Sequence, residues 1–307
     1  MPKLFECLHA FLILNSYFLI ALTAAAQPSP QTSTADLRAK FDRRLQEIAA
    51  RVDGVVGYEI VDLVSGDRFT HLEREAFPTA STIKLTLVYE LFKQADEGKV
   101  RLDETMRLDR SKAVGGTGVL IDLGTPTLSI QDYATLMVTL SDNTATNVLI
   151  DRLGMENVAK RMQALGLGGT KLRRHMMDTA AARRGDENVS TPDELVKLLQ
   201  AMNGAHGGAE GGSFAMPQAI ELLKKSKESR LRRGLPPGVA TADKPGELDG
   251  VRVDAGVVYV AKRPYVFAVM TTFLKDEIEG ERAIEEMSRA SYEYFSRLAG
   301  GPLGRRM

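Results

Sequence analysis

The chain has 307 residues, and its 40 basic and 40 acidic side chains cancel. Nucleic acid is therefore an unexpected partner, because its binding needs a basic surface. The only cysteine is Cys7, near the amino terminus, so a disulfide framework is excluded. The length is sufficient for one large globular unit.

Residues 1–26 differ in composition from the rest of the chain. Lys3 precedes an apolar stretch at residues 11–22 and small residues at 24–26, which is the order of an export signal and its cleavage site. The apolar stretch is short beside the roughly 20 residues of a membrane-spanning helix. We therefore expect cleavage after Ala26 and a periplasmic or secreted protein that is not held in a membrane.

The remaining chain has strands near both ends and helices between them. The polar segment 27–35 predicts a linker. Apolar periodicity and turn residues predict a helix at 37–50, strands at 55–62, 67–71, 251–258 and 265–272, and a terminal helix at 277–298. Capping boxes at 129–132 and 191–194 predict two helix starts in the middle of the chain.

This order indicates an α+β fold in which both chain ends form one antiparallel sheet with flanking helices, and an all-α lobe is inserted. We assign the α/β lobe to residues 36–80 and 236–300 and the helical lobe to residues 81–235, within one catalytic domain at 36–300. The cleft between two such lobes is the expected site.

Ser81 and Lys84 are the first candidates for chemistry. They open an amphipathic run at residues 85–95, so both side chains lie on one helix face. A lysine held among cations or away from water can take the proton of a serine hydroxyl, which makes the serine a nucleophile. The unpaired N–H of Ser81 at the helix start can stabilise an oxyanion. The pair alone is weak, since a match of this kind is expected about once by chance in such a chain.

Two further elements raise the significance of this pair. Ser141-Asp142-Asn143 follows Ser81 by 60 residues, and Lys244-Pro245-Gly246 follows after another 103. The three elements resemble the S-x-x-K, S-D-N and K-T-G signatures of the class A β-lactamases and of the wider penicillin-recognising serine hydrolases. The resemblance includes residues 77–84, 115–120, 136–154 and 242–258, and so extends over most of the chain.

The resemblance implies a covalent acyl-enzyme on Ser81, formed with help from Lys84. It further implies that Ser141 relays a proton to the leaving nitrogen and that Lys244 holds the Ser141 hydroxyl and attracts the substrate carboxylate. Asn143 is expected to bind the acylamino side chain. The N–H of Glu247 is expected to be the second oxyanion donor, with Gly246 allowing close backbone approach.

Two departures from the family pattern stand out. Pro245 replaces a hydroxyl residue that helps to hold the substrate carboxylate in the family, and Arg252 is a candidate substitute, although a solvated surface arginine is the simpler interpretation. The family's deacylating glutamate is also missing. Counting back from Pro192 places it near His175. Asp178 and His175 are candidate bases, with Asp178 preferred, and the absence of any base stays open.

Three functions fit these residues. The preferred one is a β-lactamase, which hydrolyses small β-lactam substrates. The second is a peptidoglycan D,D-peptidase or penicillin-binding enzyme with slow deacylation, and the third is a non-catalytic module that binds cell-wall peptides. The four histidines have no metal-ligand spacing, so no metal is expected. No cofactor is expected either, and we expect a monomer.

Overall fold

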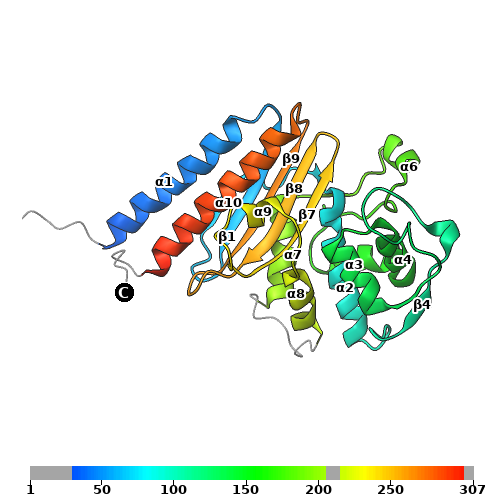
Figure 1. Cartoon of the computed structure of the whole chain (residues 1–307). Helices are drawn as coiled ribbons and strands as arrows, with labels where there is room; N and C mark the ends of the chain where they lie inside the picture. The colour runs from blue at the N-terminus through cyan, green and yellow to red at the C-terminus, as the bar shows by residue number, and fades with distance from the viewer. Residues whose placement is uncertain (1–29, 205–214, 301–307) are drawn as a thin grey trace, which may run out of the picture.

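Both ends of the chain contribute strands to one five-stranded antiparallel sheet (Figure 1). The computed structural model describes residues 30–204 and 215–300. In the order β2-β1-β9-β8-β7, the strands are Arg68–His71, Val55–Asp62, Tyr265–Thr272, Val251–Val258 and Thr241–Leu248. The α+β fold predicted from the sequence is confirmed.

Two long helices cover one face of the sheet and lie side by side, α1 (Pro30–Ala50) and α10 (Glu277–Ala299) (Figure 1). The ring of Phe41 in α1 stacks on that of Tyr294 in α10, with the centroids 4.4 Å apart. Leu45 and Ile48 on the same side of α1 are also buried. The apolar face predicted for residues 37–50 is therefore the face that packs.

Helix α1 begins at Pro30, several residues before the predicted start. Most of the predicted linker at 27–35 is therefore helical, and that part of the prediction is wrong. A run of Pro, Ser and Thr reads as a linker, but proline is well tolerated in the first turn of a helix because its missing N–H has no partner there. The predicted signal peptide at residues 1–26 lies outside the described residues.

The helices of the chain's middle part form a second lobe, and one of them, α7 (Pro192–Asn203), packs on the other face of the sheet against β1, β8 and β9. The longer ones are α2 (Lys84–Asp96), α3 (Ile130–Thr139), α4 (Asn143–Leu153), α5 (Met155–Ala164), α7 (Pro192–Asn203) and α8 (Met216–Lys224). The shorter elements are β3 (Phe77–Pro78), β4 (Thr105–Arg107), β5 (Thr127–Ser129), β6 (Val189–Ser190), α6 (Thr179–Arg183), α9 (Arg230–Arg233) and the 3₁₀ turns η1 (Ala80–Ile83) and η2 (Arg110–Lys112).

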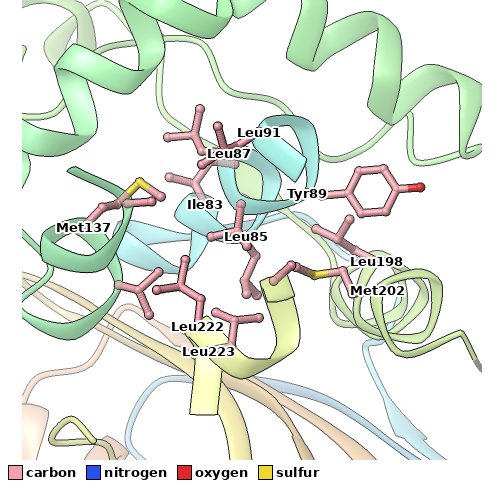
Figure 2. Packing of buried hydrophobic residues seen from close by; sticks show 14 of the residues in the cluster. Ile83, Leu85, Leu87, Tyr89, Leu91, Met137, Leu198, Met202, Leu222 and Leu223 are labelled. Carbon is pink, nitrogen blue, oxygen red and sulfur yellow. The ribbon is translucent and has the colours of Figure 1, made fainter. Parts of the chain in front are cut away.

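Helix α2 is the centre of this second core. Ten of its 13 residues are buried, because helices or strands surround it on nearly every side. Figure 2 shows apolar side chains of α2 and η1 meeting those of α3, α7 and α8, including Ile83, Leu85, Leu87, Tyr89, Leu91, Met137, Leu198, Met202, Leu222 and Leu223. This packing fixes the start of α2, where the candidate nucleophile lies.

The predicted helix starts are found where the capping residues place them. Ser129 and Asp132 form a reciprocal capping box at α3. At α7, the Thr191 hydroxyl accepts from the Glu194 N–H, whereas the Glu194 carboxylate accepts from the Gly169 N–H at 2.8 Å and from Thr170 Oγ1 at 2.6 Å. The second capping box is therefore only half formed, and its glutamate ties α7 to the loop before it.

The short helix α9 belongs to the other lobe than the one predicted. The sequence assigned residues 81–235 to the helical lobe, but α9 packs against α10, β7 and β8 of the α/β lobe. In residues 30–204 and 215–300, no helix has the length and apolarity needed to cross a membrane.

One buried acid lies in the sheet far from the cleft residues considered above. Glu59 in β1 is completely buried, and its carboxylate pairs with Arg68, which also bonds Asp193 Oδ1 at 2.9 Å. Burial raises the pKa of Glu59 from 4.5 to about 7, although the Arg68 guanidinium opposes the shift. The native state therefore retains a proton that the unfolded chain releases between these two pH values.

We predict that Glu59→Gln has a higher free energy of unfolding than the wild type at alkaline pH, and that this difference disappears at acidic pH. Below about pH 4.5 the acid is protonated in both states, so the wild type loses nothing there; between pH 4.5 and 7 only the unfolded state ionises, which destabilises the native wild type. The expected gain at pH 8 is on the order of 2 kcal/mol. Urea unfolding at pH 4 and pH 8 measures it, and an equal difference at both pH values would contradict it.

Candidate active site

Ser81 lies in the 3₁₀ turn η1, immediately before α2, so the predicted position at a helix start is correct although the turn is not α-helical. The preceding residue, Ala80, has φ of 47°, a left-handed conformation that is unfavourable for alanine. Thr79 is held by Asn188, whose carbonyl oxygen accepts from the N–H and from the hydroxyl of Thr79, each at 3.0 Å. These contacts present Ser81 to a cleft.

Lys84 follows one turn later and is fully buried. Its Nζ donates to Ser141 O at 2.6 Å, to Ser141 Oγ at 3.0 Å and to Asn143 Oδ1 at 3.1 Å. Burial, followed by the charge of Lys244, lowers the pKa of Lys84 well below its ordinary value, and Asp142 opposes this. The three acceptor oxygens would stabilise an ammonium group, whereas burial and the charge of Lys244 favour the neutral amine.

The Ser141 segment is shaped by its neighbour Asp142. Ser141 itself has φ of 53°. The Asp142 carboxylate caps α4 by accepting from the Ala145 N–H at 2.8 Å, and it also accepts from the N–H groups of Val119 and Leu120 at 2.7 and 2.9 Å. Asp142 thus joins the loop at 115–120 to the start of α4. The sequence motif contained Asp142 but did not reveal this structural role.

Lys244 reaches Ser141 from the opposite lobe. Its Nζ donates to Ser141 Oγ at 3.1 Å and to Pro245 O at 2.8 Å. Burial, followed by the charge of Lys227, lowers the pKa of Lys244 to about 8. The three-residue element lies within strand β7, which was not among the strands predicted from the sequence. Because β7 is an edge strand, the missing N–H of Pro245 can be tolerated.

Gly246 lies where β7 crosses the nucleophile turn. A Cβ atom at this position would be 2.6 Å from Thr79 O and 2.7 Å from Thr82 Oγ1, which is too close for any side chain. The Thr82 hydroxyl also donates to Lys244 O at 3.3 Å. Glycine is therefore required for the close approach of the two segments.

A cleft of about 870 Å³ lies between the lobes. The described residues that line it include six of the eight predicted site residues, namely Ser81, Ser141, Asn143, Lys244, Gly246 and Glu247, with Pro245 beside them. Lys84 lies directly behind, bonded to Ser141 and Asn143. The remaining predicted residue, Asp178, is elsewhere.

Asp178 and His175, the two candidate bases, are outside this lining. The Asp178 carboxylate accepts from the Ala181 N–H at 2.9 Å and caps α6. His175 Nε2 lies 2.9 Å from Asp151 Oδ1. The loop therefore directs both groups away from the cleft.

Met176 is a buried loop residue that lines the cleft, together with Arg174, Met177 and Asn188. Asn147 in α4 fixes it by two bonds, since Asn147 Oδ1 accepts from the Met176 N–H at 2.8 Å and Asn147 Nδ2 donates to Met176 O at 3.1 Å. The sequence count placed the missing glutamate near His175, one residue too early for the side chain that the loop presents.

The arginine near the cleft is also different from the predicted one. Arg252 is absent from the lining, and its guanidinium donates to Glu281 Oε1 at 3.0 Å and to Leu248 O at 2.9 Å. Arg230 in α9 lines the cleft, is only 9% exposed and pairs with Glu247 and Glu281. Sequence reasoning missed Arg230, because only the tertiary fold brings α9 to this strand.

Comparisons with known proteins agree with this geometry. A family model described as the Beta-lactamase enzyme family matches residues 40–295. β-Lactamase SME-1 of Serratia marcescens is 23% identical over 286 residues, which cover 91% of this chain and 96% of that protein.

Two solved structures are similar over most of the chain. A β-lactamase from Sphaerobacter thermophilus has a TM-score of 0.74 and 29% identity, with 83% of this chain and 96% of that chain covered. A penicillin G acyl-enzyme complex of a leucine-to-glutamate variant of PBP-A has a TM-score of 0.75 and 27% identity, with 84% and 96% covered. Together with the family match over most of its length, the fold and the cleft show that this chain belongs to the β-lactamase enzyme family.

Proposed function

We propose that this protein is a serine β-lactamase that opens the β-lactam amide through an acyl-enzyme on Ser81. The observation that carries the proposal is the placement of Ser141 Oγ between two buried amines, 3.0 Å from Lys84 Nζ and 3.1 Å from Lys244 Nζ. A neutral Lys84 accepts the Ser81 proton as Ser81 Oγ bonds to the carbonyl carbon. Ser141 then gives its proton to the departing ring nitrogen and regains one from Lys84.

The same contacts support the assignment of the binding groups. The N–H groups of Ser81 and Glu247 act as oxyanion donors, and the close approach at Gly246 brings their two segments together. Asn143, whose Nδ2 also donates to Gly115 O at 3.0 Å, contacts the acylamino side chain. In place of the hydroxyl missing at Pro245, Arg230 provides positive charge for the substrate carboxylate.

Deacylation is the step with the least support from the cleft. The bonds of Asp178 and His175 direct them to Ala181 and Asp151, so we do not assign either of them as the base. The apolar side chain of Met176 cannot accept a proton from water. A slow second step is consistent with this position.

A second function, a D,D-peptidase or penicillin-binding enzyme with slow deacylation, is favoured by Met176. The PBP-A variant with which an acyl-enzyme of penicillin G was observed carries a glutamate in place of a leucine. A purely binding module is disfavoured, because Ser81, Lys84 and Ser141 are all present and Lys84 donates to Ser141.

The location of the protein follows from its amino terminus alone. We infer export to the periplasm or the exterior after removal of residues 1–26, because their order of charge, apolar stretch and small residues is that of a signal peptide. We also propose that the protein is a monomer.

We predict that the protein without residues 1–26 gains the mass of one penicillin molecule and that Ser81→Ala does not. Intact-mass spectrometry over time after mixing measures both the formation and the loss of the adduct. Decay within seconds indicates a β-lactamase, whereas persistence for hours indicates the slow penicillin-binding alternative. A wild type that forms no adduct and also hydrolyses no penicillin would exclude both.

We predict that Gly246→Ala slows acylation by at least about 100-fold, because its methyl group would push β7 away from Thr79 and Thr82 and misalign the oxyanion donors. Gly168→Ala is a matched control, since its added Cβ would meet nothing within 4 Å. Adduct formation by mass spectrometry measures both. Equal rates for the two variants would contradict the proposed approach at Gly246.

We predict that Met176→Glu shortens the lifetime of the acyl-enzyme by about 100-fold, since a carboxylate at this clamped position could activate water. Met176→Gln has a similar shape but no base, and it is expected to leave the lifetime near that of the wild type. The lifetime is measured by loss of the penicillin adduct after dilution. If Met176→Glu and Met176→Gln release the product equally slowly, Met176 does not occupy the position of the base.

A further inference from the structure

Two aspartates lie behind the strand that carries Lys244. Asp243 in β7 is opposite Gly256 of β8 in the sheet register, and Asp254 is two residues from Gly256. The two aspartates therefore share one face of the sheet and are diagonal neighbours across the pair of strands. Both are completely buried, on the face covered by α9. Lys244 alternates to the other face and reaches Ser141.

Each aspartate uses one oxygen and leaves the other without a partner. Asp243 Oδ1 accepts from Arg232 Nε at 2.8 Å, and Asp254 Oδ2 accepts from the Leu231 N–H at 3.0 Å. Asp243 Oδ2 and Asp254 Oδ1 are buried and have no hydrogen-bond partner among residues 30–204 and 215–300. Two ionised carboxylates buried on one face of the sheet would repel each other, and a proton on the pair removes one negative charge and supplies a hydrogen-bond donor.

The positive groups around the pair are of two kinds. On the α9 side, Arg232 bonds Asp243, and Arg230 acts on Asp254 through its charge. In the loop before α9, Lys227 Nζ is 3.6 Å from Asp243 Oδ1, and only 2% of its side chain is exposed. Lys227 also donates to Leu223 O and Lys225 O, at 2.5 and 2.8 Å, so it is fixed in place.

These groups act on Lys244 in opposite directions. Lys227 disfavours the charged form of Lys244, while Asp254 and Asp243, and to a smaller extent Glu247, favour it. On the other side of Lys244, the positive form of Lys84 would repel it, and Ser141 Oγ is the shared acceptor. The charge on Lys244 therefore depends on how many protons the aspartate pair holds.

We propose that Asp243 and Asp254 share one proton and act together as a positioning unit that keeps Lys244 charged when the shared proton is released. The proposal rests on the function proposed above, in which charged Lys244 attracts the substrate carboxylate. No aspartate of the pair touches the substrate; both act through Lys244.

The direction of the pH effect follows from the two affected groups. Burial and the charge of Asp243 raise the pKa of Asp254 to about 7, and the pKa of Lys244 is about 8. As the pH rises past 7, the pair gains a negative charge just before Lys244 would lose its proton. The new charge favours protonated Lys244, so acylation is maintained to higher pH.

The test is the pH profile of acylation in Asp254→Asn. Asparagine can still accept from the Leu231 N–H and donate to Asp243, but it cannot ionise. We expect the rate constant of acylation by a chromogenic cephalosporin to be unchanged at pH 6, and its alkaline decline to begin about one pH unit lower than in wild type. Glu59→Gln is the matched control, because it removes another buried acid of similar pKa that is distant from Lys244. In Glu59→Gln, the alkaline decline of the acylation rate constant should begin at the same pH as in the wild type.

Infrared spectroscopy tests the shared proton without any substrate. In the Glu59→Gln protein, the carbonyl stretch of a buried protonated carboxylic acid should be present at pH 6, fade toward pH 8, and be absent when Asp254→Asn is added. Absence of this band at pH 6 overturns the proposal, even if Asp254→Asn folds poorly.

An alkaline decline that is the same in Asp254→Asn and wild type also overturns the proposal. If the wild type neither forms an adduct with any β-lactam nor hydrolyses one, the proposed function fails instead, while the infrared result still decides the fate of the shared proton.

Discussion

Two buried amines from opposite lobes meet at a single hydroxyl, and the rest of the cleft is organised around this contact. Ser141 Oγ lies about 3 Å from Lys84 Nζ and from Lys244 Nζ. Two ammonium groups so close together and away from water would repel strongly. The arrangement is stable only if at least one amine is neutral and the lobes are held in register. The packing around α2 and the close approach at Gly246 supply that register.

The surroundings of the two lysines explain why they divide the work. Lys84 is bonded to neutral oxygens of Ser141 and Asn143, and the nearest influential acid, Asp142, is already engaged by three N–H groups. Lys244 has a buried aspartate pair behind it. Lys84 therefore loses its proton more readily and suits the role of base, while Lys244 retains charge and suits the role of attracting an anion.

The fold could be predicted from the sequence because its helices and strands follow from patterns within short stretches of the chain. The strands at 55–62, 251–258 and 265–272 and the helix at 277–298 follow from apolar patterns and turn residues, and the structure agrees with them. Ser81, Lys84, Ser141 and Lys244 could be found because each lies in a short motif. Arg230 and the pair Asp243 and Asp254 could not, since they meet only through the register of β7 and β8 and the docking of α9.

The loop at 171–191 shows a different limit. It has little regular structure, so no periodicity indicates which side chain faces the cleft, and counting residues gave His175. The orientation is set by side chains that bond its backbone, Asn147 at Met176 and Asn188 at 173 and 174.

The two halves of the reaction therefore depend on different parts of the chain. The groups for acylation lie on η1, α2, the start of α4 and β7, all of which are fixed by core packing. In the proposed mechanism, the position from which a side chain would activate water is that of Met176, on a loop whose backbone is held there by two hydrogen bonds to Asn147. A substitution at Met176 can change deacylation without disturbing acylation, because the clamp from Asn147 binds only backbone atoms. In this fold, the difference between a hydrolase and a protein that stays acylated can thus depend on one loop side chain.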